Sequence, residues 1–203
     1  PPDFRDAALS ALGVRSAADA RPPSAERRRS AAGPSRFLDP IRDADVLAYE
    51  TFFSEEIASL IGALCGAVKD ASDGRFATGA FYGYVVEMAC HGAAMRHGGH
   101  LALRKILADD RVDFLASPTS YMKRSPRDGA SFAMTTTETV LASGKAYFHE
   151  NDVRTFLLWE DAGYGRADTA EESAVQLRRE GAYANAHGLG LWWFDMIGGF
   201  YDH

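Results

Sequence analysis

The chain has 203 residues, of which 46% are hydrophobic and 25% charged, so it holds enough apolar material for one domain or for part of a larger one. Its formal charge of −6 argues against nucleic-acid binding through phosphate contacts. No apolar run approaches the roughly 20 residues of a membrane helix, and no signal segment opens the chain. We therefore expect a soluble protein with no membrane partner, either cytoplasmic or secreted.

The two ends of the chain look cut from something longer. It starts at Pro1 without a methionine, and it stops at His203 directly after an apolar, aromatic segment. Two cysteines, Cys65 and Cys90, form neither a metal motif nor a disulfide framework, and we expect no cofactor. Cys65 lies among apolar residues and is expected in the core.

Residues 1–45 differ in composition from residues 46–203. They hold six of the eight prolines and eight of the 22 basic residues, including the run Arg27-Arg28-Arg29. This composition is typical of a surface loop or linker with at most a short helix. We interpret the arginine run as a solvated loop, with docking or an anion site as the alternative.

Residues 46–203 alternate between helical patterns and short apolar runs. An amphipathic helix is expected over 46–69, because Val46, Tyr49, Phe53, Ile57, Leu60, Leu64 and Val68 recur at steps of three or four. Thr169-x-x-Glu172 predicts a capping box that opens a helix over 169–187. Further helices are predicted over 99–107 and 137–142, and strands over 77–85, 112–116, 145–148 and 189–194.

This alternation predicts an α/β fold with a parallel sheet. Four strands with three intervening helices amount to half of an eight-stranded (β/α) TIM-type barrel. A doubly wound sheet also fits the alternation, but no glycine-rich phosphate loop follows any predicted strand. We therefore expect residues 46–203 to form the C-terminal half of a barrel.

The chemistry of such a barrel lies at the carboxyl ends of its strands, and all four ends here are rich in aromatic and ionisable residues. Aromatic faces stack on sugars, while carboxylates bind their hydroxyl groups, so we expect a carbohydrate site. Glu150 is the sharpest candidate, because Arg154 and Tyr121 would keep it ionised and able to act as a nucleophile. The alternative is a structural ion pair between Glu150 and Arg154.

Further strand-end residues are candidates for substrate binding, each with a structural alternative. Trp192 and Trp193 point to opposite faces, so only one of them would line the barrel mouth and the other would pack against helices. Asp195 would bind a sugar hydroxyl or cap the loop through Gly198 and Gly199. A competing metal site would use His91, His97 and His100, although no His–carboxylate pair follows a strand.

The strand-end runs together resemble the second half of a β-galactosidase-like glycoside hydrolase barrel, nearest to family 42 within clan A. The resemblance rests on Phe81-Tyr82-Gly83-Tyr84, Trp192-Trp193-Phe194-Asp195, and residues 99–103, 112–121 and 144–155. It implies a retaining glycosidase acting on β-galactosides or related β-glycosides, with Glu150 as the strand-seven nucleophile. Tyr84, Tyr121, Arg154, Trp192, Trp193 and Asp195 would then contact the sugar or support the nucleophile.

The same resemblance places the acid/base glutamate at the end of strand four, which would precede Pro1. Glu87 follows the first strand here and does not correspond to it. The isolated chain is therefore expected to be inactive and to pair with a missing N-terminal half or with a second copy. Two further hypotheses stay open: a non-catalytic carbohydrate-binding barrel, and a metal-dependent barrel hydrolase.

Overall fold

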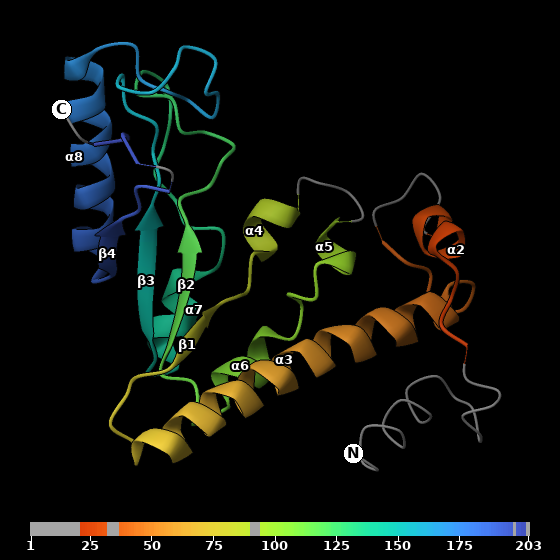
Figure 1. Cartoon of the computed structure of the whole chain (residues 1–203). Coiled ribbons are helices and arrows are strands. Elements are labelled where there is room, and N and C mark those ends of the chain that lie inside the picture. The colour runs from red at the N-terminus through yellow and green to blue at the C-terminus, as the bar shows by residue number, and fades with distance from the viewer. Residues whose placement is uncertain (1–20, 32–36, 90–93, 197, 202–203) are drawn as a thin grey trace.

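The structure, a computed structural model, describes residues 21–31, 37–89, 94–196 and 198–201. Within them the fold is α/β, with four parallel strands that alternate with helices (Figure 1). The strands lie side by side in sequence order. They are β1 (Gly79–Phe81), β2 (Phe114–Pro118), β3 (Ala146–Asn151) and β4 (Gly190–Trp193). The predicted parallel sheet is thus confirmed.

The helices differ in length from those that the patterns predict. They are α2 (Ala25–Ser30), α3 (Ala44–Ser72), α4 (Val85–Met88), α5 (Ala94–His97), α6 (Leu103–Leu107), α7 (Thr137–Ala142) and α8 (Ala170–His187). The predicted strand over 77–85 shortens to three residues, because Gly83 takes a φ of 87° and turns the chain into α4. The predicted helix over 99–107 shortens to α6.

The capping residues of α8 act as the sequence predicts. The hydroxyl of Thr169 accepts a hydrogen bond from the backbone N–H of Glu172 at 3.2 Å. The Glu172 carboxylate reaches back to the N–H of Asp168 at 2.8 Å. At the other end Gly188 adopts the left-handed conformation, which glycine reaches without a Cβ clash. These caps fix both ends of α8 behind β3 and β4.

The hydrophobic core lies between one face of the sheet and the helices. Leu115 of β2 and Tyr147 of β3 point into it from the sheet, and both are fully buried. Ile106 of α6 and Val140 of α7 cover them, together with Cys65 of α3, which is buried as predicted. Because alternate strand residues face opposite sides, Phe114, Phe148 and Glu150 point to the other face.

That other face of the sheet is apolar and carries no helix among the described residues. Phe81, Phe114, Phe148 and Trp192 line a hollow on it. The rings of Phe81 on β1 and Trp192 on β4 have centroids 5.9 Å apart, although β2 and β3 separate these strands. Strands are spaced by about 4.8 Å, so a flat sheet would hold β1 and β4 about 14 Å apart. The contact indicates that the sheet curves toward its open face.

The residues that α3 buries differ from the apolar face that the sequence predicts. Its buried row consists of small and polar residues, including Ser54, Ala58 and Gly62, while Leu60 and Leu64 stay exposed. A Cβ at Gly62 would lie 2.0 Å from the Asp109 carboxylate, so a larger residue here would require the side chain of Asp109 to move. The fully buried row of α3 thus consists mainly of small and polar residues. Ile57 and Ile61 pack partly buried against the core, whereas Leu60 and Leu64 point outward.

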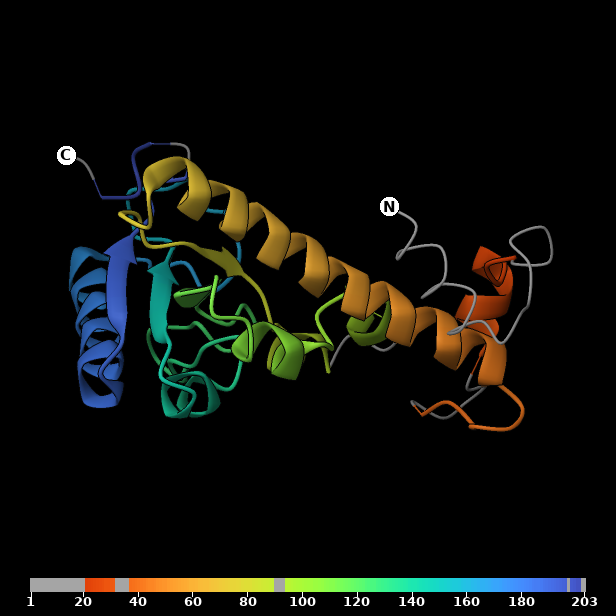
Figure 2. The ribbon, with the colours of Figure 1, turned by 90° about the horizontal axis from the view of Figure 1, so that it is seen from below.

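The length and composition of α3 also contradict the expectation that no segment is apolar enough to cross a membrane. Of the described helices, it alone is long and apolar enough to cross one by length and composition. The same criterion selects packed helices of soluble proteins, so it is weak grounds for a membrane span. Figure 2 shows α3 running along the molecule from the sheet to the segment around α2.

The described part of residues 1–45 contains one short helix, α2, as the composition allows. Its arginine run is not simply solvated, because it contacts the start of α3. Arg27 pairs with Asp43 at 3.1 Å and with Asp45 at 2.8 Å. The guanidinium of Arg28 lies 4.9 Å above the ring of Tyr49. Residues 1–20 and 32–36 of this segment lie outside the described residues.

Candidate functional site

Glu150 lies at the carboxyl end of β3 on the open face of the sheet. It stands in register between Pro118 of β2 and Trp192 of β4. The residue is only 6% exposed, and its carboxyl group makes no hydrogen bond or ion pair with another described residue; the charges that act on it are those of Asp152 and Arg124. Burial, together with the charge of Asp152, raises the pKa of Glu150 to about 7, while Arg124 opposes the shift. A carboxyl group with this pKa exchanges its proton near neutral pH.

The expectation that Arg154 and Tyr121 hold Glu150 ionised is wrong. The guanidinium of Arg154 lies 4.3 Å above the ring of Tyr164, and it makes no ion pair with Glu150. The hydroxyl of Tyr121 instead donates to Asp152 at 3.0 Å. The proposed structural ion pair between Glu150 and Arg154 is likewise not formed.

Tyr84 nevertheless lies near Glu150, and Tyr121 lies beside Tyr84 in the wall of the same cavity. Burial raises the pKa of Tyr84, and the nearby charges of Glu150 and Tyr121 add to this shift. Burial raises the pKa of Tyr121 to about 12. Both tyrosines line a mostly apolar cavity of about 590 Å³ at the ends of β1 and β2. Its other lining residues are Glu87, Met88, Ala94, Pro118, Met122, Met134 and Tyr164.

The wall of this cavity includes a strained tyrosine. Tyr164 has a φ of 48°, and its neighbours Gly163 and Gly165 both have a φ of 69°. The left-handed region is unfavourable for a tyrosine and persists where surrounding structure enforces it. The loop places the Tyr164 ring edge-on to Tyr121, with centroids 5.0 Å apart. The loop thus accepts a strained backbone at Tyr164 and presents the exposed ring beside Tyr121.

A buried ion pair joins the ends of β2 and β3 beneath the tyrosines. Arg124 and Asp152 are both fully buried, with 2.6 Å between Nη2 and Oδ1. Arg124 also donates to the carbonyl oxygens of Ser120 and Thr119, and its guanidinium lies 3.9 Å above the ring of Tyr121. Asp152 therefore acts as a buried fixture of the site and has no exposed surface for a ligand.

Helix α8 supports this pair from behind. Gln176 donates to the carbonyl oxygens of Arg124 at 2.6 Å and of Gly165 at 3.2 Å. Arg179 donates to the carbonyl of Arg124 at 3.0 Å. Both the arginine loop and the Tyr164 loop are thus anchored to one rigid helix.

A second buried network lies on the helix-facing side of the sheet. His149 Nε2 is 2.8 Å from the hydroxyl of Thr119 and 3.5 Å from Glu180 on α8. Hydrogen bonds from His149, Ser131 and Arg179 lower the pKa of Glu180, despite the opposing effect of its burial. This network lies behind the sheet, so it connects β2, β3 and α8 and does not face the open side.

The two tryptophans divide between the faces as predicted. Trp192 shares the open face with Glu150 and packs against Phe148, with ring centroids 6.1 Å apart. Trp193 points the other way, is 42% exposed and stacks edge-on with Tyr201. Asp195 accepts hydrogen bonds from the backbone N–H groups of Gly199 and Phe200, at 3.0 and 2.9 Å. Of the two roles considered for Asp195, capping this loop is the one that the structure shows.

The histidines do not converge in the part of the chain that the structure describes. His97 lies beside Glu50, whereas His100 stacks on Tyr84 and accepts a hydrogen bond from the N–H of Gly83. Burial lowers the pKa of His100. His91 lies outside the described residues, and within them no three His, Cys, Asp or Glu residues form a group able to hold a metal.

Several residues at the site were not singled out from the sequence. The ion pair between Arg124 and Asp152 could not be predicted from a local pattern, because the two residues are 28 positions apart in the sequence. Only their positions after predicted strands pointed to the site. Tyr201 lies near Asp152 and Glu150, and its hydroxyl donates to the carbonyl of Asn151 at 2.9 Å. The Gly-Tyr-Gly sequence around Tyr164 was the one readable hint, since paired glycines favour an unusual turn.

Comparisons with known proteins add no relative. No protein-family model matches the chain, and no curated protein or solved structure matches it. The resemblance to family 42-like glycoside hydrolases therefore rests on the strand-end motifs alone. What the geometry itself establishes is an α/β sheet whose carboxyl edge gathers tyrosines, a buried Arg124–Asp152 pair and the unpaired carboxyl group of Glu150.

Proposed function

We propose that this chain supplies the nucleophile half of a retaining glycoside hydrolase that acts on β-galactosides or related β-glycosides. The observation that carries the proposal is the position of Glu150. Its carboxyl group is buried, unpaired among the described residues, and placed at a strand end on the same face as Trp192. A group that does not serve the fold with a partner is available for chemistry.

The shape of the sheet supports a barrel as the setting of this site. Its core-forming helices lie over one face, the sheet curves toward the other face, and β1 and β4 have no outer neighbour among the described strands. An added set of parallel strands would pair with both edges and cover Phe148 and Trp192. A missing N-terminal half, or a second copy of this chain, would supply these strands.

The reaction proceeds in two displacements. Ionised Glu150 attacks the anomeric carbon as the bond to the leaving oxygen breaks, and a second carboxyl group donates a proton to that oxygen. Water then attacks the glycosyl ester and restores Glu150. Tyr84, Tyr121 and Trp192 would contact the sugar, whereas Asp152 positions Tyr121 from below.

The second carboxyl group must come from a residue other than Glu87 or Asp152. Glu87 lines the cavity, but it already accepts hydrogen bonds from the Ser120 hydroxyl and from the N–H of Tyr121. Asp152 is completely buried and paired with Arg124. This agrees with the resemblance, which assigns the acid/base to the other half of the barrel.

Azide rescue tests the proposal on the full-length protein. Dinitrophenyl β-galactoside needs no proton donor, and with Glu150→Gly azide would attack the anomeric carbon while dinitrophenolate leaves. A nucleophile variant of a retaining enzyme yields the α-galactosyl azide. Glu160→Gly, which removes an exposed carboxylate, serves as the matched control. A β-galactosyl azide would instead make Glu150 the acid/base and overturn the assignment.

A non-catalytic carbohydrate-binding barrel is the second candidate, and the environment of Glu150 favours it over a metal-dependent hydrolase. With a pKa of about 7, this carboxyl group is largely protonated in mildly acidic solution, where it is a poor nucleophile and a good hydrogen-bond donor. Galactoside binding that survives Glu150→Gln, without cleavage by the unaltered protein, would support binding alone. A metal-dependent hydrolase would instead lose its activity to chelators.

A further inference from the structure

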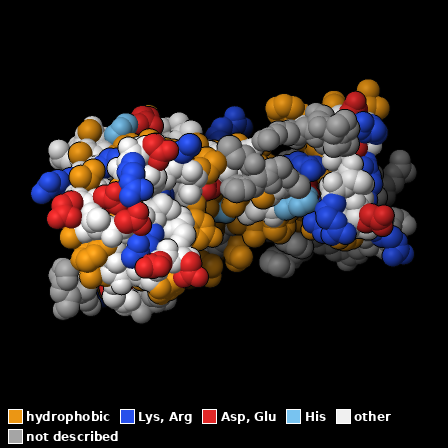
Figure 3. All heavy atoms as spheres, turned by 90° about the horizontal axis from the view of Figure 1, so that it is seen from above, with side chains coloured by type: hydrophobic (Ala, Val, Ile, Leu, Met, Phe, Trp, Pro, Cys, Tyr) orange, Lys and Arg blue, Asp and Glu red, His pale blue; other side chains and the backbone are white. Residues whose placement is uncertain are grey.

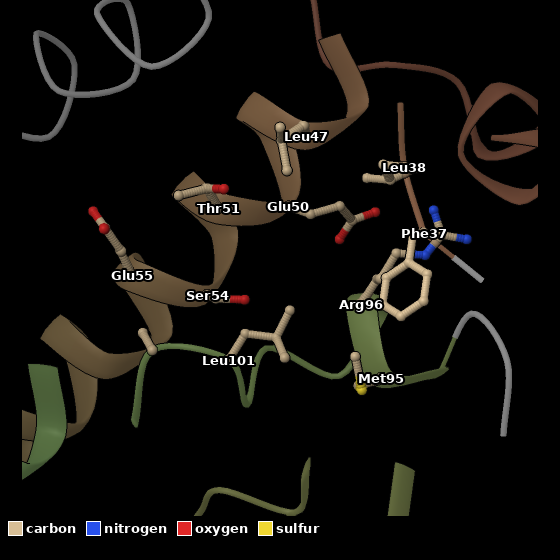
Figure 4. A pocket seen from close by; sticks show the side chains of 11 residues that line it. Phe37, Leu38, Leu47, Glu50, Thr51, Ser54, Glu55, Met95, Arg96 and Leu101 are labelled. Carbon is tan, nitrogen blue, oxygen red and sulfur yellow. The ribbon is translucent and has the colours of Figure 1, made fainter. Parts of the chain in front are cut away.

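A second cavity lies between the first half of α3, helix α5 and the segment at residues 37–38, and it shares no lining residue with the cavity at the strand ends. Its volume is about 400 Å³. Figure 4 shows its walls at close range. In the space-filling view of Figure 3, hydrophobic side chains gather in the middle of the molecule, between the sheet and the segment around α2. The lining residues are Phe37, Leu38, Leu47, Glu50, Thr51, Ser54, Glu55, Met95, Arg96, Leu101 and Ala102.

Two polar side chains on this wall are buried without being satisfied. Glu50 is 3% exposed and Ser54, one helical turn later, is 2% exposed. Among the described residues, neither carboxylate oxygen of Glu50 nor the Ser54 hydroxyl has a hydrogen-bond partner. The Nε and Nη1 atoms of Arg96 are also buried without a partner there. Leaving such groups unpaired costs about 1–3 kcal/mol each, so a fold rarely retains them without a use.

The charges on this wall are opposite but separated. Figure 4 shows the carboxylate of Glu50 and the guanidinium of Arg96 turned toward the same space, beside the ring of Phe37. They interact electrostatically but form no ion pair. His97 Nε2 lies 3.3 Å from Glu50, yet burial and then the charge of Arg96 lower the pKa of His97, which weakens it as a charged partner for the carboxylate.

The ligand that suits this wall carries both charges. An ammonium group alone would lie next to Arg96 and Arg28, and a carboxylate alone would lie next to Glu50. A zwitterion places each charge beside its opposite, with the Ser54 hydroxyl as an additional partner. Leu47, Met95 and Leu101 offer an apolar wall for the rest of the molecule. The volume lies in the range of small-molecule sites.

We propose that this cavity binds an α-amino acid with an apolar side chain, whose ammonium group pairs with Glu50 and whose carboxylate pairs with Arg96. The site is independent of the glycosidase proposal, because none of its residues belongs to the strand ends. It brings together α5 and the first half of α3, whose lining residues the first proposal does not use.

The test compares three probes that share one apolar body. L-Phenylalanine carries both charges, 3-phenylpropionate lacks the ammonium group, and 2-phenylethylamine lacks the carboxylate. The full-length protein is labelled with ¹³C at its methionine methyl groups. Met95 reports on this cavity, whereas Met88, Met122 and Met134 report on the cavity at the strand ends.

L-Phenylalanine should shift the Met95 signal in a saturable manner and leave the other three signals in place. Each single-charge probe should bind about tenfold or more weakly, since it leaves one buried charge unpaired. Equal affinities for the three probes would mean that the cavity binds the apolar body alone, and this result would overturn the proposal. Absence of any shift at Met95 would also overturn it.

Variants assign the two charged contacts. Glu50→Gln should abolish the preference for L-phenylalanine over 3-phenylpropionate, and Arg96→Met should abolish its preference over 2-phenylethylamine. Glu55→Gln is the matched control, because Glu55 is exposed and its carboxylate points away from Glu50 (Figure 4). If Glu50→Gln keeps the full preference in a chain with unchanged Met134 signals, the proposed contact is wrong.

Discussion

Replacing Glu150 by glutamine should stabilise the folded chain, and this gain should grow with pH. The pKa of Glu150 rises from 4.5 to about 7 on folding, first through burial and then through the charge of Asp152. Between these pH values the folded chain retains a proton that the unfolded chain has released. The free energy of unfolding therefore falls as pH rises from about 4.5 to 7, and it levels off above that range.

The magnitude follows from the same shift. At about 1.4 kcal/mol for each pKa unit, the displacement from 4.5 to about 7 corresponds to about 3 kcal/mol. Glutamine keeps the size of the side chain without titrating, so Glu150→Gln should gain most of this amount at about pH 8 relative to about pH 5. Such a gain is a substantial part of the 5–15 kcal/mol that is typical of domains.

Urea unfolding at a series of pH values between about 5 and 8 measures this difference. Glu160→Gln, at an exposed position, is the control and should show the pH dependence of the unaltered chain. If the difference between Glu150→Gln and the unaltered chain stays constant across this range, the argument from burial and Asp152 is refuted.

Three further substitutions test the support of the site, each by urea unfolding. Arg124→Met leaves the carboxylate of Asp152 buried and unpaired and should cost about 3–5 kcal/mol; a loss below about 1 kcal/mol would mean that water reaches Asp152. Gly165→Ala should cost about 1–3 kcal/mol, since its φ is 69° and the new Cβ would lie 2.6 Å from Ser125 N; an unchanged midpoint would contradict the close packing of this loop. Thr169→Ala should cost about 1 kcal/mol by removing the cap of α8, and no loss would show that water replaces the hydroxyl.

Local signals in the sequence predicted the elements best where one residue type dictates the backbone. Thr169, Glu172 and Gly188 define α8 because caps act over three or four residues. The parallel sheet followed from the alternation of apolar runs with helices. The strand at Gly79 was predicted too long, because its apolar pattern continues past Gly83, where the chain turns.

Tertiary packing determines two features that the sequence pattern does not predict: which side of α3 is buried, and which residues contact Glu150. The apolar row predicted for α3 is divided by the packing, since Val46 is buried and Ile57 packs against the core, whereas Leu60, Leu64 and Val68 are exposed. At the site, Glu150 was placed correctly by its strand, but its partners were not. Arg154 is four residues away from Glu150 and yet stacks on Tyr164, whereas Arg124, which follows β2, pairs with Asp152 at the end of the neighbouring strand β3.

The open face of the sheet joins the questions of assembly and catalysis. Phe148 and Trp192 lie on a face that the described residues do not cover, and the proposed reaction at Glu150 would need a second carboxyl group on the same side. A strand set that pairs with β1 and β4 would meet both needs at once, because strand ends of a closed barrel face a common centre. It would also remove water from Glu150 and raise its pKa further, unless it brought a cation. On this reasoning, the half of the barrel that completes the proposed enzyme must contribute a positive or hydrogen-bond-donating group toward Glu150 as well as the proton donor.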